Sequence, residues 1–226
     1  MRLAISSLLI FLTFSVVGQQ MSFGAKGGLT VGTQQNRRAL PSYHGLLFFE
    51  SSNAGKDMGN GVLNSLGFFT QLGYHRKGSS LAYVSYVGFR PDDVFHNLSL
   101  TIGGKSYYAM DPFIFYFGLG ARLDVTVSDS LTTQYTSSQI NRFNAGLWIG
   151  GGAEWNIPKF PMGLVLEVSL NPDLTPQIFV PPGTVRQYYD YSTNTWKTQA
   201  VPEERIINLT FEVSLGFKFN IPKQTN

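Results

Sequence analysis

Strict alternation of apolar and polar residues over long segments is the feature that most constrains this chain. From Ile207 to Ile221 every second residue is apolar, and the residues between them are polar, charged or glycine. A period of two is typical of a β-strand with two different faces. At about 15 residues, the segment is far longer than the usual strand of five or six. The pattern therefore predicts an all-β protein with unusually long strands.

Seven further segments repeat this alternation, some clearly and some more weakly. After Gly18, no window holds a helical period over three turns or about 18 consecutive apolar residues, which excludes helical bundles and helical membrane proteins. An even number of strands closes with both chain ends on one side. We therefore expect an eight-stranded antiparallel up-and-down transmembrane β-barrel, with strands at Phe23–Val31, Tyr43–Glu50, Leu66–Arg76, Val94–Ile102, Phe113–Val125, Phe143–Ile157, Met162–Leu170 and Ile207–Ile221.

The expected connections alternate in length, as in outer-membrane barrels, where extracellular loops are long and periplasmic turns are short. The shortest predicted turn is Pro158–Pro161, whereas Ser51–Ser65 and Gly103–Pro112 fit the alternation less well. The long connections are Gly32–Ser42, Gly78–Asp93, Ser128–Asn141 and Asn171–Glu204.

The first residues predict export. Met1 and Arg2 give a basic start, Leu3 to Val17 form an apolar run, and small residues surround a cleavage point after Gly18. We interpret residues 1–18 as a signal peptide and 19–226 as one barrel domain. The chain has no cysteine, so it offers no disulfide framework and no thiolate chemistry.

Charge and glycine predict which face of each strand looks inward. Only 14% of residues are charged, against about 25% in soluble domains, so the chain lacks the charge to cover a water-facing surface. The polar face is rich in glycine, which suits the narrow interior of a small barrel. We therefore expect a network of ion pairs in the lumen, made by Lys26, Arg122, Asp124, Glu154, Glu167, Glu212 and Lys218.

The opposite face carries bulky apolar residues, with aromatic residues near the predicted strand ends. Aromatic girdles of this kind mark the two membrane–water boundaries of a transmembrane barrel. We expect the protein in the outer membrane of a Gram-negative bacterium, in contact with its lipid. A secreted soluble barrel that binds a ligand is the alternative that alternation alone would also fit. The girdle residues are Phe23, Tyr43, Phe49, Tyr74, Phe113, Phe143, Trp155, Phe217 and Phe219.

Six short motifs along the chain resemble the PorT-like outer-membrane β-barrel family of Bacteroidetes. Their order and spacing over most of the mature chain carry the resemblance, more than any single motif. They are FGAKGGLTVG (Phe23–Gly32), QLGYHRKG (Gln71–Gly78), FGLGARL (Phe117–Leu123), GLWIGGGAEW (Gly146–Trp155), GLVLEVSL (Gly163–Leu170) and FEVSLGFKF (Phe211–Phe219).

The resemblance implies an eight-stranded barrel, and the namesake of the family is an accessory of a protein-secretion system. Gln71 stands where the family often has an acidic residue in the third strand, so the lumen network is expected to differ there. Fold alone does not transfer the secretion role.

Few residues suggest chemistry. The three histidines lie on different predicted strands without a metal-binding motif, so we expect no metal and no cofactor. His96 and Ser99 raise the alternative of a lipid-modifying enzyme, but residues three apart on a strand face opposite ways. Asp92 and Asp93 are best interpreted as a solvated turn rather than a calcium site. We expect no catalytic residues, and a formal net charge of +3 does not suggest nucleic acid.

The long connection before the last strand is the most suggestive functional feature. It interleaves aromatic residues with prolines, and rigid aromatic side chains in a displayed loop favour binding to a partner. A loop folded over its own barrel mouth is the alternative. We expect a non-enzymatic membrane-anchored protein that contacts a protein of the envelope or of a secretion complex, with no small-molecule substrate. The candidate contact residues are Phe179, Tyr188, Tyr189, Tyr191 and Trp196.

Overall fold

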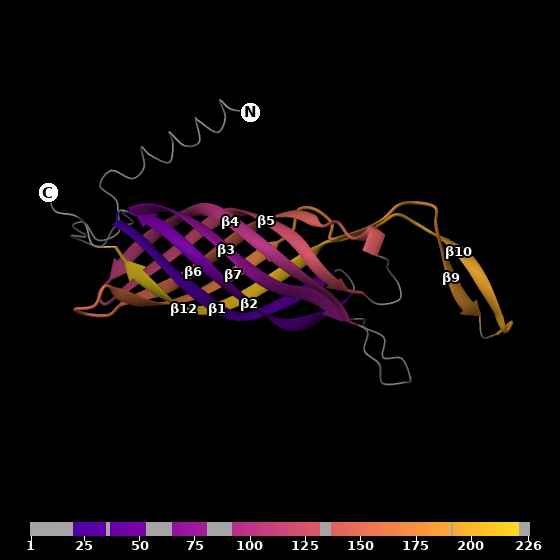
Figure 1. The fold of residues 1–226 in the computed structure, drawn as a ribbon, viewed down its shortest axis with the longest axis horizontal. Coiled ribbons are helices and arrows are strands. Elements are labelled where there is room, and N and C mark those ends of the chain that lie inside the picture. The colour runs from indigo at the N-terminus through magenta and orange to yellow at the C-terminus, as the bar shows by residue number, and fades with distance from the viewer. Residues whose placement is uncertain are drawn as a thin grey trace, which may run out of the picture.

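Eight long strands close into one antiparallel barrel in a computed structural model, which describes residues 20–34, 37–52, 65–80, 92–131, 137–190 and 192–221 (Figure 1). Neighbouring strands pair in the order β1-β12-β7-β6-β5-β4-β3-β2. The predicted signal peptide, residues 1–18, lies outside the described residues. The barrel strands are β1 (Gln20–Gln34), β2 (Arg38–Ser52), β3 (Ser65–Ser80), β4 (Asp92–Met110), β5 (Phe113–Ser130), β6 (Phe143–Asn156), β7 (Met162–Pro172) and β12 (Asn208–Asn220).

The prediction of an eight-stranded antiparallel barrel is confirmed, but six of the eight strands extend further than the alternation indicated, whereas β6 and β12 are one and two residues shorter than expected. The connection expected at Gly103–Pro112 is wrong, because β4 continues to Met110 and pairs with β5 as far as Phe113. The reason lies inside the barrel. A side chain at Gly103 would come within 2.8 Å of the Phe69 ring, so this glycine makes room for a lumen residue and is not a turn signal.

The segment Asn171–Glu204 is also more ordered than a loop. It contains β8 (Ile178–Val180), β9 (Thr184–Asp190), β10 (Thr195–Val201) and β11 (Glu204–Ile206). β8 pairs with β11, and β9 pairs with β10, in two separate two-stranded sheets. β8 and β11 have only three residues each, too few to show a clear alternation, which is why the sequence did not reveal these two strands.

A small apolar core joins β8 and β11 to the barrel. Ile178 and Val180 are fully buried and pack with apolar residues of β4, β11 and the segment after a short 3-10 helix, η1 (Ser137–Gln139). Backbone hydrogen bonds extend this contact. The Asn141 amide donates to the Gln177 carbonyl oxygen, and the Gln177 amide donates to the Ile206 carbonyl oxygen. The base of the extension is therefore fixed to the barrel. The cluster consists of Phe95, Ile140, Ile178, Val180 and Ile206.

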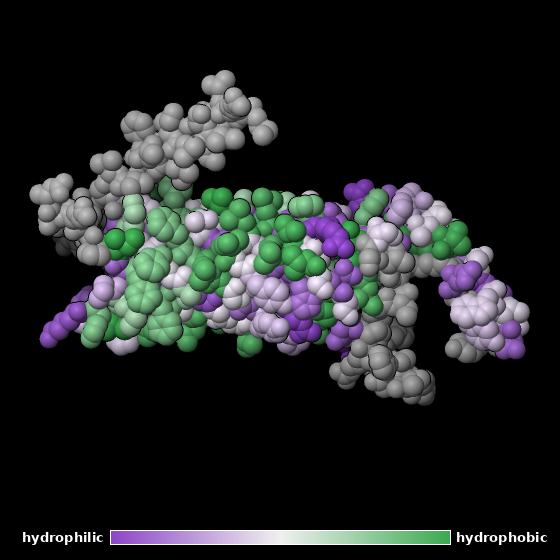
Figure 2. Space-filling model, viewed as in Figure 1, coloured by the Kyte–Doolittle hydropathy of each residue, from purple (hydrophilic) through white to green (hydrophobic). Residues whose placement is uncertain are grey.

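The two faces of the barrel wall have opposite polarity. On β12, Leu215 is 64% exposed, whereas Glu212 and Lys218 are at most 5% exposed. Hydrophobic residues cover much of the wall, and hydrophilic residues gather toward the end that carries β9 and β10 (Figure 2). An apolar exterior around a polar interior is the arrangement of an outer-membrane barrel, and the protein is one.

This distribution of apolar and polar residues excludes the alternative of a soluble barrel, because a soluble barrel would place its apolar face inward. Within the described residues, no helix is long and apolar enough to cross a bilayer.

Candidate functional site

Three lysines and three glutamates form a buried cluster, here called the lower cluster, near the barrel end where β12 terminates. Alternation brings them inward from six strands, and each is at most 5% exposed. Lys26 pairs with Glu167, and Lys105 with Glu50, while Lys218 Nζ lies 2.6 Å from Glu154 and 3.3 Å from Glu50. Equal numbers of charges of each sign compensate much of the cost of burial. The members are Lys26, Glu50, Lys105, Glu154, Glu167 and Lys218.

Tyrosines complete the lower cluster. The Tyr116 hydroxyl donates to Glu167 at 2.7 Å, and the Tyr107 hydroxyl lies 3.4 Å from Glu50. The Lys105 ammonium also lies 4.1 Å from the centre of the Tyr116 ring, close enough for a cation–π contact. Each carboxylate of the lower cluster therefore either contacts more than one partner or shares its partner with another carboxylate. The lower cluster is thus one connected network.

A second charged group, the upper cluster, lies toward the end of the barrel that carries β8 and β11. Lys77 Nζ is 2.8 Å from both Asp124 and Asp173, and the Arg122 guanidinium is 2.8 Å from Asp173 and 3.1 Å from Asp124. Two cations thus share two carboxylates. Asp173 directly follows β7, so the upper cluster ties the start of the extension to the lumen.

Two stacked histidines separate the charged clusters. The rings of His44 and His75 are 5.5 Å apart, and His75 Nδ1 lies 2.6 Å from Glu212. His44 bonds to Thr30 at 2.8 Å through one ring nitrogen and to Ser214 at 2.7 Å through the other. Both nitrogens of His44 are thereby occupied. Such a fixed ring is suited to a structural role in the lumen.

Large aromatic side chains fill the lumen between these groups. Phe69 and Trp148 meet edge to face at 4.8 Å, and each is at most 2% exposed. Glycines on the surrounding strands make the necessary space, since a side chain at Gly150 would come within 2.3 Å of the Trp148 ring. The interior is packed with side chains, as expected for eight strands.

The seven charged residues expected in the lumen all lie there; six of them make ion pairs, and Glu212 lies 2.6 Å from His75 Nδ1. Sequence reasoning missed six further members of the network. Longer strands would have revealed Lys105 and Lys77, because the inward alternation of β4 and β3 continues through them. Asp173 carried no such signal, since it lies beyond a strand end. The missed residues are His44, Glu50, His75, Lys77, Lys105 and Asp173.

Gln71 is buried in the lumen, and its side-chain nitrogen has no hydrogen-bond partner among the described residues. It lines a narrow gap next to Arg122 and Asn171, each of which also has one buried polar atom without a partner among the described residues. Three buried polar atoms around this gap thus have no protein partner among the described residues.

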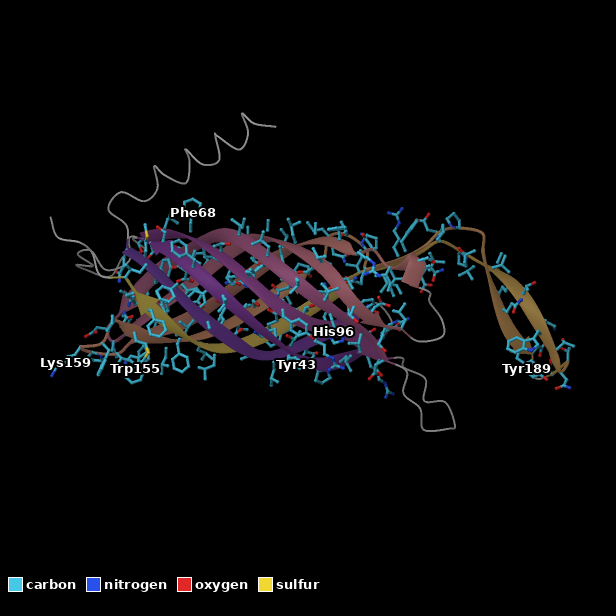
Figure 3. The ribbon with its side chains drawn as sticks, viewed as in Figure 1. Tyr43, Phe68, His96, Trp155, Lys159 and Tyr189 are labelled. Carbon is cyan, nitrogen blue, oxygen red and sulfur yellow. The ribbon has the colours of Figure 1, made fainter. Side chains whose placement is uncertain are left out.

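The nine girdle residues lie on the outer wall, and eight of them are at least 40% exposed. Phe23 stacks on Phe219 at 5.5 Å near one end of the barrel. Near the other end, the rings of Tyr43 and Tyr74 are 6.1 Å apart, and Tyr74 is the partly buried member of the nine. Figure 3 labels Trp155 near one end of the barrel and Tyr43 farther along the wall, toward the end that carries the hairpin. Phe68, 61% exposed, and Phe117, 62% exposed, are outward aromatics that the prediction missed.

The residues considered for chemistry are kept apart. His96 bonds to Tyr74 on the outer wall, whereas Ser99 donates to Asp124 in the lumen, so they lie on opposite faces as expected. The interpretation of Asp92 and Asp93 as a solvated turn is wrong, because both begin β4 and Asp93 is buried against Arg37. In the described part of the chain, no group of three metal-binding side chains comes together.

The candidate contact residues divide between two places. Phe179 lies on β8 at the barrel mouth, 38% exposed, with the Arg205 guanidinium 5.6 Å from its ring centre. Tyr189 and Trp196 face each other across the β9–β10 hairpin, with ring centres 5.3 Å apart. Tyr188 belongs to β9, but its side chain is outside the described residues, as is all of Tyr191. The extension thus both packs on the mouth and displays a hairpin.

The hairpin stands away from the barrel (Figure 1), with Tyr189 near its far end (Figure 3). Trp196 is 70% exposed and Val185 is 61% exposed, so the sheet has no apolar core of its own. Beside Asp190, hydrogen bonds from Lys197 and from Ser192 hold the pKa of the carboxyl below its usual range. Local polar contacts of this kind shape the hairpin.

No protein-family model matches the chain, and no curated protein sequence does. Several solved structures share the barrel shape at low identity. Neisserial surface protein A is 10% identical, with 89% of this chain and 97% of that chain covered and a TM-score of 0.47. A major outer membrane protein from Thermus thermophilus is 14% identical, with 90% and 100% covered and a TM-score of 0.48.

The outer membrane protease OmpT from Escherichia coli is 12% identical, with 89% of this chain and 97% of that chain covered and a TM-score of 0.38. The names of these structures thus include both a surface protein and an enzyme. Likeness at this level is one of shape, and it assigns no activity.

Proposed function

We propose that the protein is a non-enzymatic outer-membrane anchor that presents the β9–β10 hairpin to a protein partner outside the barrel. The observation that carries the proposal is the hairpin itself. It is ordered, it extends beyond the barrel, and both of its strand edges are unpaired among the described residues. An isolated two-stranded sheet is only marginally stable in water, so a surface of this kind is suited to completion by a partner.

The chemistry of the hairpin favours a protein partner. Aromatic side chains with large exposed area, such as Trp196, dominate protein–protein contact energies. An unpaired strand edge offers backbone donors and acceptors to an added strand. The packed lumen supports the same proposal, because a filled interior leaves the surface as the place for specific contact.

The resemblance to the PorT-like family adds a more specific proposal. We propose that the chain belongs to that family and that its partner is a component of a protein-secretion or surface assembly. What supports this is the order of six motifs along the strands, from Phe23–Gly32 to Phe211–Phe219. In the absence of paired catalytic side chains among the described residues, we propose no reaction for the barrel.

Site-specific crosslinking in living cells tests the anchor function. A photo-reactive amino acid at Trp196 is expected to yield one discrete protein adduct in outer-membrane fractions. The matched control is Phe160, which is 66% exposed in the turn between β6 and β7 at the other end of the barrel. A shared adduct at both positions, or none at Trp196, would contradict the proposal.

A second measurement tests the secretion role. Replacing residues 184–201 by a short Gly-Ser turn should leave the barrel intact, because β8 and β11 carry the contacts to it. Loss of an exported protein from the culture medium, with unchanged amounts of barrel in the outer membrane, is the expected result. Unchanged export would reject the secretion role while leaving the anchor function open to the crosslinking result.

A further inference from the structure

A polar and cationic cluster interrupts the apolar outer wall near the end of the barrel that carries the hairpin. It comprises Tyr43 on β2, Tyr74 and Arg76 on β3, and His96 on β4. Figure 3 labels Tyr43 and His96 of this cluster. The Tyr74 hydroxyl bonds to His96 Nδ1, and the Arg76 guanidinium lies 6.0 Å from the centre of the Tyr43 ring. Arg76 and His96 are direct partners in the β3–β4 ladder. Four side chains from three strands thus form one surface.

The position of this cluster marks a membrane boundary. Along the outward face of β3, Leu72 is followed by Tyr74 and then by Arg76, and along β4 Leu98 is followed in the same direction by His96. A change from leucine to tyrosine to arginine is typical of the step from hydrocarbon to headgroup. Because this end lies opposite both ends of the barrel chain, it faces the outer leaflet.

An apolar groove begins directly beside the cluster. Its volume is about 400 Å³, within the range of ligand pockets, and it runs across the outward faces of β3, β4, β5 and β6. Leu98 lines the groove and is the ladder partner of Tyr74. The small side chain of Ala145, opposite Leu123 in the ladder, leaves space between larger neighbours.

The charge of the cluster selects the ligand. Among the described residues Arg76 has no carboxylate partner, in contrast to Arg122 in the lumen. Guanidinium groups bind phosphate with two parallel hydrogen bonds, and tyrosine and histidine at a membrane boundary can add further donors. We propose that the cluster and groove bind a phosphorylated lipid of the outer leaflet, with the phosphate on Arg76 and His96 and an acyl chain in the groove.

The site differs from a general lipid-facing wall in joining two specific features. Here the proposed phosphate position and the acyl groove are adjacent, because Leu98 lines the groove and is the ladder partner of Tyr74. This inference does not depend on the proposed partner of the hairpin, since the site lies on β2 to β6 and not on β9 or β10.

Native mass spectrometry of the full barrel in mild detergent tests the site with three probes. Phosphatidic acid carries phosphate and acyl chains, diacylglycerol with the same chains lacks the phosphate, and inorganic phosphate lacks the chains. We expect one phosphatidic acid molecule bound per barrel, at least about tenfold more tightly than either other probe, a ratio that corresponds to about 1.4 kcal/mol. Equal binding of diacylglycerol, or equal binding of free phosphate, would overturn the proposal.

Variants locate the binding. The double substitution Arg76→Gln with His96→Gln should lower phosphatidic acid affinity at least about tenfold, and Ala145→Phe should lower it by filling the groove. Lys159→Gln removes a charge at the opposite end of the barrel and should leave affinity unchanged. Heat-dependent gel migration confirms that each variant is folded. Arg76 and His96 lie on the outer face, away from the packed lumen. The double variant therefore still tests the site if Ala145→Phe fails to fold. Unchanged affinity in the double variant would disprove the site.

Discussion

The lower cluster of the lumen and the β9–β10 hairpin each contain an ion pair between a lysine and a carboxylate, but one pair is buried and the other is exposed to water. In the lumen, Lys105 pairs with Glu50, and both side chains are at most 2% exposed. In the hairpin, Lys197 pairs with Asp190, with exposed fractions of 43% and 19%. Water screens the second pair and not the first. The difference teaches that an ion pair can hold the barrel together in one region and only shape a surface in the other.

The two regions also differ in what covers them. Every lumen residue is surrounded by eight paired strands, so its neighbours are fixed by the ladder. In the hairpin, β9 and β10 pair only with each other among the described residues, and Trp196 is exposed. The barrel is therefore rigid, and the hairpin is accessible to a partner, because the two regions differ in strand pairing and not in residue composition.

The largest expected effect is that of breaking the buried pair. Lys105→Met leaves Glu50 in the lumen with one cation fewer, and loss of one partner of a buried pair costs about 3–5 kcal/mol. The free energy of unfolding, measured by urea titration in detergent micelles, should fall by that amount. Lys197→Met is the matched control in the hairpin and should cause no measurable change. Equal effects of the two substitutions would remove the contrast.

A charge on the outer wall sharpens the contrast between barrel and hairpin. Leu215→Arg, near the middle of β12, should cost about 2–4 kcal/mol, because it places a charge in hydrocarbon. Val185→Arg in the hairpin starts from a similar exposure, 61% against 64%, and should cost nothing measurable because water surrounds it. Folding yield into lipid vesicles measures both. A tolerated arginine at position 215 would argue that this face does not contact lipid.

Filling the lumen tests its packing. Gly150→Val places methyl groups against the Trp148 ring and should cost about 1–3 kcal/mol by overpacking. Gly45→Val is the matched control, because a side chain at Gly45 would meet no atom within 4 Å. The midpoint of heat-dependent gel migration reports the difference. Similar midpoints for both variants would mean that the lumen is loosely packed.

The smallest expected effect is a local response of the hairpin to acid. Since the folded pKa of Asp190 is lowered, chiefly by its hydrogen bond from Lys197, its contribution to stability is present above the ordinary aspartate pKa and is lost as pH falls below it. Amide chemical shifts of β10 should change in that range, and Asp190→Asn should abolish the change. A response of the same size in the Asn variant would assign it to another group.

Sequence reasoning succeeded where side chains alternate and failed where they do not. The period of two placed Lys26 and Glu167 on one face, and the structure brings their side chains into contact. It missed Lys105 because Gly103 and Gly104 resemble a turn when their neighbours across the barrel are unknown. It missed β8 and β11 because strands of three residues have no measurable period.

By itself, the sequence determined an all-β chain with long two-faced strands and too little charge for a water-facing surface. The strand period is a local property of the backbone, so it can be read from neighbouring residues. Only the tertiary structure decided which cation meets which carboxylate, since Lys218 and Glu154 lie 64 positions apart and meet across a closed ladder. It also decided that Arg76 and His96 stand side by side above an apolar groove, because strand register is a property of the whole barrel.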